Sequence, residues 1–188
     1  MATNTQTMAT GHSSAIELAL HKIDTVDVPQ GKHIALAYSG GLDSTLCVKL
    51  SQLKYHARKL TAITVDVGQG EAEIGESSER AKKLGISPLV IDARQEFTEQ
   101  WLSKAIQANS DYNGYPVSTS MTRQLIAARV AQKALELGCD ALMEGSTGKG
   151  NDQYRMHNVF SLFAPGTAIF VPVRDFDQIG RASCRERV

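Results

Sequence analysis

Residues 33–45 read HIALAYSGGLDST, and this stretch decides the fold. Its first part, residues 34–38, is an apolar run that predicts a buried strand, and it leads without a break into Ser39-Gly40-Gly41 and a helical pattern. Two adjacent glycines at the end of a strand let the backbone turn sharply and approach a ligand closely. The stretch therefore predicts a strand, a glycine loop and a helix in immediate succession.

The same alternation continues along the chain. Aliphatic runs typical of buried parallel strands recur at 60–67, 89–91 and 141–143. Helical patterns lie between the runs, over 42–55, 70–84, 94–109 and 119–137, and Gly85 and Gly138 serve as helix stops. In the last helix the apolar stripe expected to face the sheet is Ile126, Val130, Ala134 and Leu137. This order predicts an α/β fold, a doubly wound parallel sheet with helices on both faces and ligands at the carboxyl ends of the strands.

The loop after the first strand suits a polyphosphate. A helix N-terminus behind two glycines offers N–H groups and a partial positive charge, and three nearby hydroxyl groups add donors. The chain lacks the lysine-containing G-x-x-x-x-G-K-[ST] loop, and Gly68-Gln69-Gly70 lacks the third glycine of a dinucleotide fingerprint. A plain strand-to-helix turn with a serine cap explains the glycines, but not Asp43 together with three hydroxyls.

A second polar stretch, GSTGKGNDQYR at residues 145–155, follows the run at 141–143. Its three glycines permit a tight backbone. Its side chains supply hydroxyl, amide, carboxylate and cationic groups, which suit a zwitterionic amino acid beside a phosphate. A solvated loop of the same polarity is the alternative.

These motifs resemble those of a known family. S-G-G-x-D-S at residues 39–44 resembles the signature of ATP pyrophosphatases, and residues 145–155 resemble the T-G-K-G-N-D-x-x-R signature of argininosuccinate synthases. The segments VDVGQ at 65–69 and YPVSTS at 115–120, which leads into a helix with Arg123, agree in order and spacing. The resemblance covers about residues 33–177, VPVRD at 171–175 included, and implies an adenine nucleotide alpha hydrolase-like fold.

The resemblance also implies a reaction, that of a carbon–nitrogen ligase of arginine biosynthesis and the urea cycle. The ureido oxygen of citrulline attacks the α phosphate of ATP, pyrophosphate leaves, and the amine of aspartate displaces AMP to give argininosuccinate. ATP is thus a substrate, and Mg²⁺ is expected to neutralise its polyphosphate. Positioning and charge stabilisation carry most of such chemistry. No residue stands out as a general base, and Asp43 is expected to act through the metal or by holding its own loop.

The resemblance assigns site residues motif by motif. The expected ATP-binding residues are Ala37, Tyr38, Ser39, Gly40, Gly41, Leu42, Asp43, Ser44, Thr45, Val65 and Gly145. Those expected to bind citrulline are Tyr115, Ser120, Asn151 and Arg155, and those expected to bind aspartate are Thr147, Asn151 and Asp152. In this scheme Arg155 pairs with the citrulline carboxylate and Asp152 with the aspartate ammonium, while Asn151 touches both substrates.

The composition of the chain limits where the protein is expected and which kinds of partner it is expected to bind. The chain is 42% hydrophobic and 21% charged, its apolar runs are too short to span a bilayer, and its start lacks a secretory pattern, so we expect a cytoplasmic protein without membrane contact. Its formal net charge is zero and it has no basic block, which argues against nucleic-acid partners and leaves small-molecule substrates. Cys47 and Cys139 are expected to be buried thiols, and His56 and His157 lack partners at metal-ligand spacing. Trp101 is expected in the core, and the charges of residues 71–83 on a solvated helix face.

We divide the chain into an extension at 1–32, an ATP-binding domain at 33–178 and a tail at 179–188. The tail, IGRASCRERV, crowds three arginines and a cysteine together and resembles a translated sequencing adapter, with a natural arginine-rich end as the alternative. The resemblance implies that a second synthetase domain, absent here, completes the citrulline site, and that the full-length protein is a homotetramer. The fragment alone is expected to be inactive.

Three other functions remain as alternatives. They are another ATP pyrophosphatase synthetase such as that for GMP, NAD or asparagine, a tRNA thiolation enzyme, and a non-catalytic adenine-nucleotide sensor. The stretch 145–155 argues against the first two, and a tRNA enzyme is expected to show a basic face or reactive cysteines. A sensor would bind ATP without releasing pyrophosphate.

Overall fold

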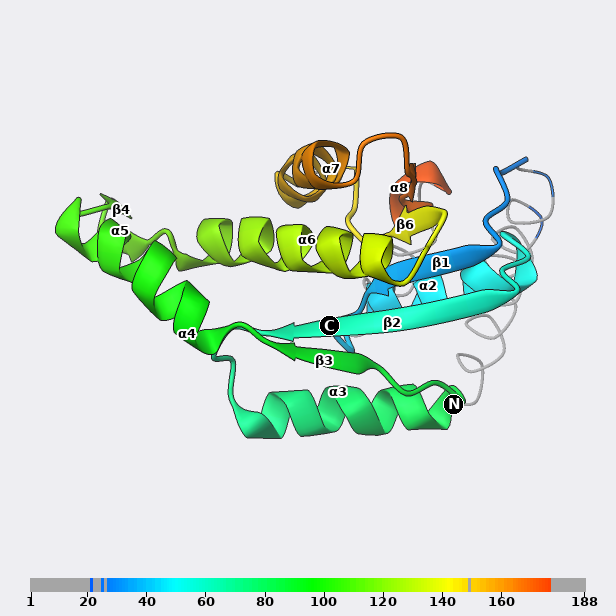
Figure 1. Ribbon diagram of the computed structural model, residues 1–188, viewed down its shortest axis with the longest axis horizontal. Helices are drawn as coiled ribbons and strands as arrows, with labels where there is room; N and C mark the ends of the chain where they lie inside the picture. Colours follow the sequence, from blue (N-terminus) through cyan, green and yellow to red (C-terminus); the bar gives the residue numbers. More distant parts are fainter. Residues whose placement is uncertain (1–20, 22–24, 26, 149, 177–188) are drawn as a thin grey trace, which may run out of the picture.

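The computed structural model describes residues 21, 25, 27–148 and 150–176 of the chain. At its centre is a sheet of five parallel strands in the order β3-β2-β1-β6-β7 (Figure 1). The strands are β1 (His33–Ala37), β2 (Lys59–Asp66), β3 (Leu89–Asp92), β6 (Ala141–Met143) and β7 (Ala168–Phe170). The four predicted strands are confirmed, whereas the edge strand β7 was not predicted. The predicted tail at 179–188 lies outside the described residues.

The helices follow the predicted pattern, except that one is interrupted and the last two were not predicted. They are α2 (Leu42–Leu53), α3 (Glu71–Lys83), α4 (Arg94–Glu96), the π-helix η1 (Phe97–Leu102), α5 (Ser103–Gln107), α6 (Ser118–Glu136), α7 (Asp152–Phe163) and α8 (Pro172–Asp175). The predicted helices at 42–55, 70–84 and 119–137 correspond to α2, α3 and α6. The helix predicted at 94–109 contains the π-turn, and α7 was not predicted because it begins inside the polar stretch at 145–155.

Side chains alternate between the two faces of the sheet, and both faces are covered. On β1, Ala35 belongs to one core cluster and Ile34 and Leu36 to the other, and Leu142 on β6 alternates with its neighbours in the same way. Helices α6 and α7 cover the Ala35 face, whereas α2 and α8 cover the opposite face. In Figure 1, α6 and α7 lie on one side of the sheet and α3 on the other. The predicted doubly wound arrangement is confirmed.

The apolar stripe of α6 agrees with the prediction except at its end. Val130 and Ala134 are fully buried, but Leu137 is 38% exposed. The helix ends at Glu136, and Gly138, with a φ of 66°, turns the chain toward β6. Leu137 therefore lies past the last helical turn and does not continue the stripe.

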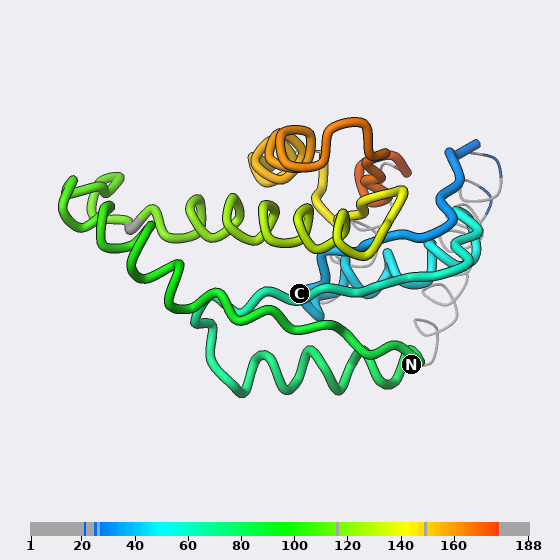
Figure 2. Tube along the Cα trace, in the orientation of Figure 1, coloured from blue at the N-terminus to red at the C-terminus, as the bar shows by residue number. Residues whose placement is uncertain are grey.

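Residues 94–116 form an arm that leads away from the sheet. It runs through α4, η1 and α5 to a hairpin of β4 (Asp111–Tyr112) and β5 (Tyr115–Pro116), at the far end of α6 (Figure 2). Asn113 and Gly114 form the two-residue turn, with φ values of 52° and 78°. Arg129 of α6 donates a 2.6 Å hydrogen bond to Glu96 and ties the base of the arm to the body.

Candidate functional site

A cavity of about 660 Å³ opens at the carboxyl edge of the sheet, beyond the ends of β1, β2 and β6. Its walls come from the loop after β1, the first turn of α2, the turn after β2, the start of α6 and the segment between β6 and α7. The chain builds β2 and β3 on one side of β1 and then crosses to β6 on the other side. The cavity thus lies at the switch point where ligands bind in open α/β sheets.

The glycine loop after β1 is held by its own hydroxyl groups. Ser39 Oγ accepts a 3.4 Å hydrogen bond from the Gly41 N–H and lies 3.3 Å from Ser44 Oγ, which donates to the Gly41 carbonyl. The first helical hydrogen bond of α2 joins Thr45 N to Gly41 O, so the N–H groups before Thr45 have no acceptor within the helix. These N–H groups and the positive end of the helix dipole can bind an anion.

Helix α3 packs against this loop and fixes Gly40. Gly40 has a φ of 75°, and a Cβ at that position would lie 2.8 Å from the Ser77 Cα, so a side chain does not fit. Arg80 Nη1 donates a 2.9 Å hydrogen bond to the Gly40 carbonyl. Most charges of α3 lie on an exposed face as predicted, but Arg80 is an exception because it also supports the loop. Its partner lies 40 residues away, which a helical pattern alone does not reveal.

The turn after β2 is closed by Gln69. Its Oε1 accepts a 2.8 Å hydrogen bond from the Val67 N–H, and its Nε2 donates to the Val65 carbonyl at 3.2 Å. Val65 is buried and lines the cavity. The segment VDVGQ therefore forms a fixed wall beside the glycine loop.

Glu144, directly after β6, is a cavity residue that the sequence analysis missed. Its side chain is 2% exposed, and its Oε2 accepts hydrogen bonds from the backbone N–H and the hydroxyl of Ser146. Oε1 has no hydrogen-bond partner within the part of the chain that the structure describes. Burial raises the pKa of Glu144 to about 7, and Asp152 adds to the rise, whereas Ser146 and Arg174 oppose it. A polar residue between a strand and Gly145 is the signal that could have identified it.

Gly145 marks the closest approach of two segments of the site. A Cβ at this position would lie 3.1 Å from the Asp43 carbonyl carbon and 3.2 Å from the Ser44 nitrogen. The end of β6 therefore packs directly on the first turn of α2. This contact brings the two sequence motifs to one wall of the cavity.

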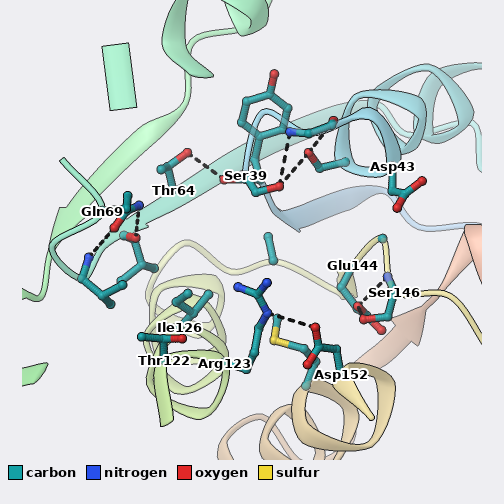
Figure 3. A pocket seen from close by; sticks show the side chains of 18 of the residues that line it. Ser39, Asp43, Thr64, Gln69, Thr122, Arg123, Ile126, Glu144, Ser146 and Asp152 are labelled. Carbon is teal, nitrogen blue, oxygen red and sulfur yellow. Dashed lines mark hydrogen bonds and ion pairs between the residues drawn. The ribbon is translucent and has the colours of Figure 1, made fainter. Parts of the chain in front are cut away.

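Asp152 is held between two arginines. Arg123 Nε on α6 donates to its Oδ2 at 3.2 Å, and Arg155 Nη1, one turn along α7, donates to its Oδ1 at 3.0 Å. In Figure 3, Arg123 points toward Asp152, while Glu144 and Ser146 lie between Asp152 and Asp43. The arrangement places both a carboxylate and a guanidinium at the cavity wall.

The predicted site residues fall into two groups. Those that line the cavity are Ala37, Tyr38, Ser39, Gly41, Leu42, Asp43, Ser44, Val65, Gly145, Thr147 and Asp152. Those that are not among its lining residues are Gly40, Thr45, Tyr115, Ser120, Asn151 and Arg155. Most residues predicted to bind ATP or aspartate thus converge, whereas the four predicted to bind citrulline do not line this cavity.

A family model matches this combination of fold and motifs. The model, arginosuccinate synthase N-terminal HUP domain, matches residues 33–186. The chain belongs to the argininosuccinate synthase family. The match overlaps the predicted tail at 179–188, and the origin of that segment stays a prediction.

Curated relatives in the argininosuccinate synthase family agree with the match. The argininosuccinate synthase of Methanocaldococcus jannaschii is 48% identical over 143 residues, which cover 76% of this chain and 36% of the relative. That of Methanococcus maripaludis is 45% identical and covers 79% of this chain and 37% of the relative. The chain thus spans about a third of the length of these relatives.

Solved structures show the same fold at low sequence identity. One is the U34-tRNA thiolase NcsA from Methanococcus maripaludis with its 4Fe-4S cluster, with a TM-score of 0.58 at 16% identity over 91% of this chain and 62% of that one. Another is a predicted subunit of tRNA methyltransferase from Methanocaldococcus jannaschii, with a TM-score of 0.57 at 19% identity over 82% of this chain and 72% of that one. Among the described residues, no helix has the length and apolar character needed to cross a membrane.

Proposed function

We propose that this chain is the ATP-binding part of an enzyme that condenses citrulline and aspartate to argininosuccinate through a citrullyl-adenylate, releasing AMP and pyrophosphate. The observation that carries the proposal is the direct packing of Gly145 on Asp43 and Ser44. It joins the ATP pyrophosphatase motif and the argininosuccinate synthase motif in one cavity. The names of the curated relatives support the same reaction.

In this proposal the glycine loop binds the triphosphate. The N–H groups at the start of α2 and the hydroxyl of Ser39 donate to phosphate oxygens, while Ser44 holds the loop through the Gly41 carbonyl. Val65 and Gly145 flank the rest of the nucleotide. The two polar motifs then orient the ureido oxygen of citrulline in line with the leaving pyrophosphate. ATP enters as its magnesium complex, so Mg²⁺ comes with the substrate. No group of three histidine, cysteine or acidic side chains in the described part of the chain could hold a metal by itself.

The aspartate site is proposed at Thr147, Asn151 and Asp152. Both oxygens of Asp152 accept hydrogen bonds from arginines, so its carboxylate has a fixed orientation toward a substrate ammonium. The proposed citrulline residues are Tyr115, Ser120, Asn151 and Arg155, and we infer that a second domain closes the pocket over them. The full-length enzyme is proposed to be a cytoplasmic homotetramer that binds neither nucleic acid nor membrane.

The likeness to tRNA enzymes extends to the fold alone, at 16–19% identity. A tRNA thiolation enzyme needs reactive cysteines, and the two described cysteines, Cys47 and Cys139, are buried, with pKa values raised by that burial. Residues 145–155 favour the amino-acid ligase. A nucleotide sensor differs from the ligase in releasing no pyrophosphate.

Three measurements test the proposal. Calorimetric titration of ATP into the 188-residue chain should show binding, weaker than that of an intact enzyme. The chain joined to the second domain of a close relative should release pyrophosphate only when both citrulline and ATP are present.

In that joined form, Arg155→Lys keeps the charge but loses the planar fork of the guanidinium group, so it should raise the KM for citrulline much more than that for ATP. If only the KM for ATP changes, Arg155 belongs to another ligand.

A further inference from the structure

One of the two carboxyl oxygens of Glu144 lacks the hydrogen-bond partner that a buried polar atom normally has. Oε2 holds the turn at Ser146, but Oε1 is buried without a partner among the described residues, and the residue lines the cavity. Buried polar atoms nearly always have a hydrogen-bond partner, since leaving one unpaired is costly. The geometry therefore favours a ligand atom as the partner of Oε1.

The charged and titratable groups around Glu144 influence whether its carboxyl is protonated when a ligand binds. Helix α2 presents Asp43 and the buried thiol of Cys47, whose Sγ donates to the Glu144 carbonyl, and α7 presents Asp152. Helix α8 presents Arg174, whose guanidinium already donates to Asp175 at 2.8 Å. From β7, the Phe170 carbonyl accepts a hydrogen bond from the backbone N–H of Glu144. Burial is therefore the largest influence on the pKa of this carboxyl, and the charge of Arg174 acts on it more strongly than that of Asp152.

The described lining of the cavity, by contrast, carries more acidic than basic side chains. Of its described lining residues, Asp43, Glu73, Glu144 and Asp152 carry carboxyl groups, and Arg123 is the one cation. A triphosphate adds several more negative charges to this wall. Asp152 is already paired with Arg123 and Arg155, and protonation of another carboxyl of this wall, or its screening by a metal, would further lower the repulsion between the wall and the ligand.

We propose that Glu144 is protonated when nucleotide binds, so that the triphosphate enters the cavity together with one proton from solvent. Its Oε1 hydroxyl then donates a hydrogen bond to a phosphate oxygen. This inference rests on the proposed nucleotide site. Burial raises the pKa of Glu144 to about 7 without ligand, and a nearby polyanion raises it further because it disfavours the ionised carboxylate. An ionised Glu144 that coordinates the magnesium of ATP would instead release a proton, which gives the opposite sign.

The test is calorimetric titration of ATP into the 188-residue chain in buffers of different ionisation enthalpy, which counts the protons bound per nucleotide. At about pH 8 the wild-type chain should take up nearly one proton, and at about pH 6 almost none, because the carboxyl is then already protonated. The ATP affinity of the wild-type chain should fall by up to about tenfold for each pH unit above 7.

Glu144→Gln keeps the shape of the side chain and should take up no proton. Its affinity at about pH 8 should equal or exceed that of the wild type. Glu136→Gln, the same change at an exposed position on α6, should behave as the wild type does.

Each other outcome is decisive. Equal proton counts in wild type and Glu144→Gln, or proton release by the wild type, would overturn this inference while leaving ATP binding intact. Absence of ATP binding by the wild type would overturn the proposed function as well. If Glu144→Gln does not fold, the carboxyl ¹³C chemical shift of Glu144 is measured in the isotope-labelled wild-type chain instead. A signal that stays ionised at about pH 7 under saturating ATP would reject the protonated form.

Discussion

The glycine loop after β1 and the arm at 94–116 both supply predicted site residues, but they are held very differently. Gly40 is buried against Ser77, and its carbonyl accepts a hydrogen bond from Arg80. Tyr115, by contrast, is 64% exposed and lies directly after the two-residue turn of the hairpin. The loop therefore has its binding shape fixed by contacts within the described residues, and the hairpin does not. We expect ATP affinity to be a property of this chain and citrulline affinity to depend on parts beyond it.

The largest expected effect is that of Gly41→Asp. The N–H groups at the start of α2 lie next to this position, and a like charge about 4 Å from a phosphate costs on the order of 4 kcal/mol at the effective dielectric of a protein surface. ATP affinity should fall by roughly 100-fold or more. Gly41 has a φ of −73°, which any residue adopts, so the fold should persist. Titration of ATP, with circular dichroism as the check on folding, measures both. Unchanged affinity would remove the loop from the site.

A pair of alanine variants comes next. Gly40→Ala forces a side chain into a positive φ and against Ser77, and should cost about 1–3 kcal/mol of unfolding free energy and weaken ATP binding. Gly41→Ala meets only Ser39 Oγ at 3.4 Å and should leave stability nearly unchanged. Urea unfolding of both variants is the measurement. Equal losses in the two would mean that α3 does not hold the loop as the contacts indicate.

The buried carboxyl of the cavity should also make stability depend on pH. Burial raises the pKa of Glu144 to about 7 in the folded chain, above the roughly 4.3 of an unfolded glutamate. The folded state then binds the proton more tightly, so this residue lowers the unfolding free energy as pH rises from about 4 to about 7. Glu144→Gln removes that loss and should gain stability relative to wild type at about pH 8 but not at about pH 4. Urea unfolding at both values tests it, and a gain that is the same at both would assign the effect to packing.

The smallest effect is expected in the arm. Tyr115→Ala removes an exposed ring, so both unfolding free energy and ATP affinity of this chain should stay within about 0.5 kcal/mol of wild type. Loss of ATP affinity in this variant would contradict the separation of the two regions. In the form joined to a second domain, the same change should raise the KM for citrulline.

The sequence could predict the sheet because its signals are local. Aliphatic runs identified β1, β2, β3 and β6, and the helical periodicity between them identified α2, α3 and α6. Strand β7, an edge strand as short as β6, was missed although its three residues are apolar. Helix α7 begins at Asp152 within a polar motif, although Met156 and Phe160, four residues apart, are buried on one face. The hairpin was not predicted, although its Asn113-Gly114 dipeptide is typical of a two-residue turn.

The site was predictable only where motifs lie next to strand ends. The loop at 39–44 and the stretch at 145–155 meet as expected, because parallel strands bring their carboxyl ends to one edge. Arg80 was missed because its partner Gly40 lies 40 residues away in sequence. The side-chain partner of Glu144, Ser146, is two residues away, but the segments that bury Glu144, such as the one with Cys47, are distant in sequence. The open position of Tyr115 follows from the course of the arm, which no local pattern encodes.

The central strand has consequences for the order of folding. The backbone N–H of Lys32, just before β1, bonds to Asp140 across 108 residues, and β1 gains β6 as its second neighbour only when that distant segment arrives. During synthesis on the ribosome, β1 and β2 can pair early, but the other edge of β1 stays open until about three quarters of the chain has emerged.

An open apolar edge is a template for pairing with other chains. Contacts over such long separations also form slowly. Nascent chains that stop before β6 should therefore be prone to aggregation, and the nucleotide site should be among the last parts of the molecule to form.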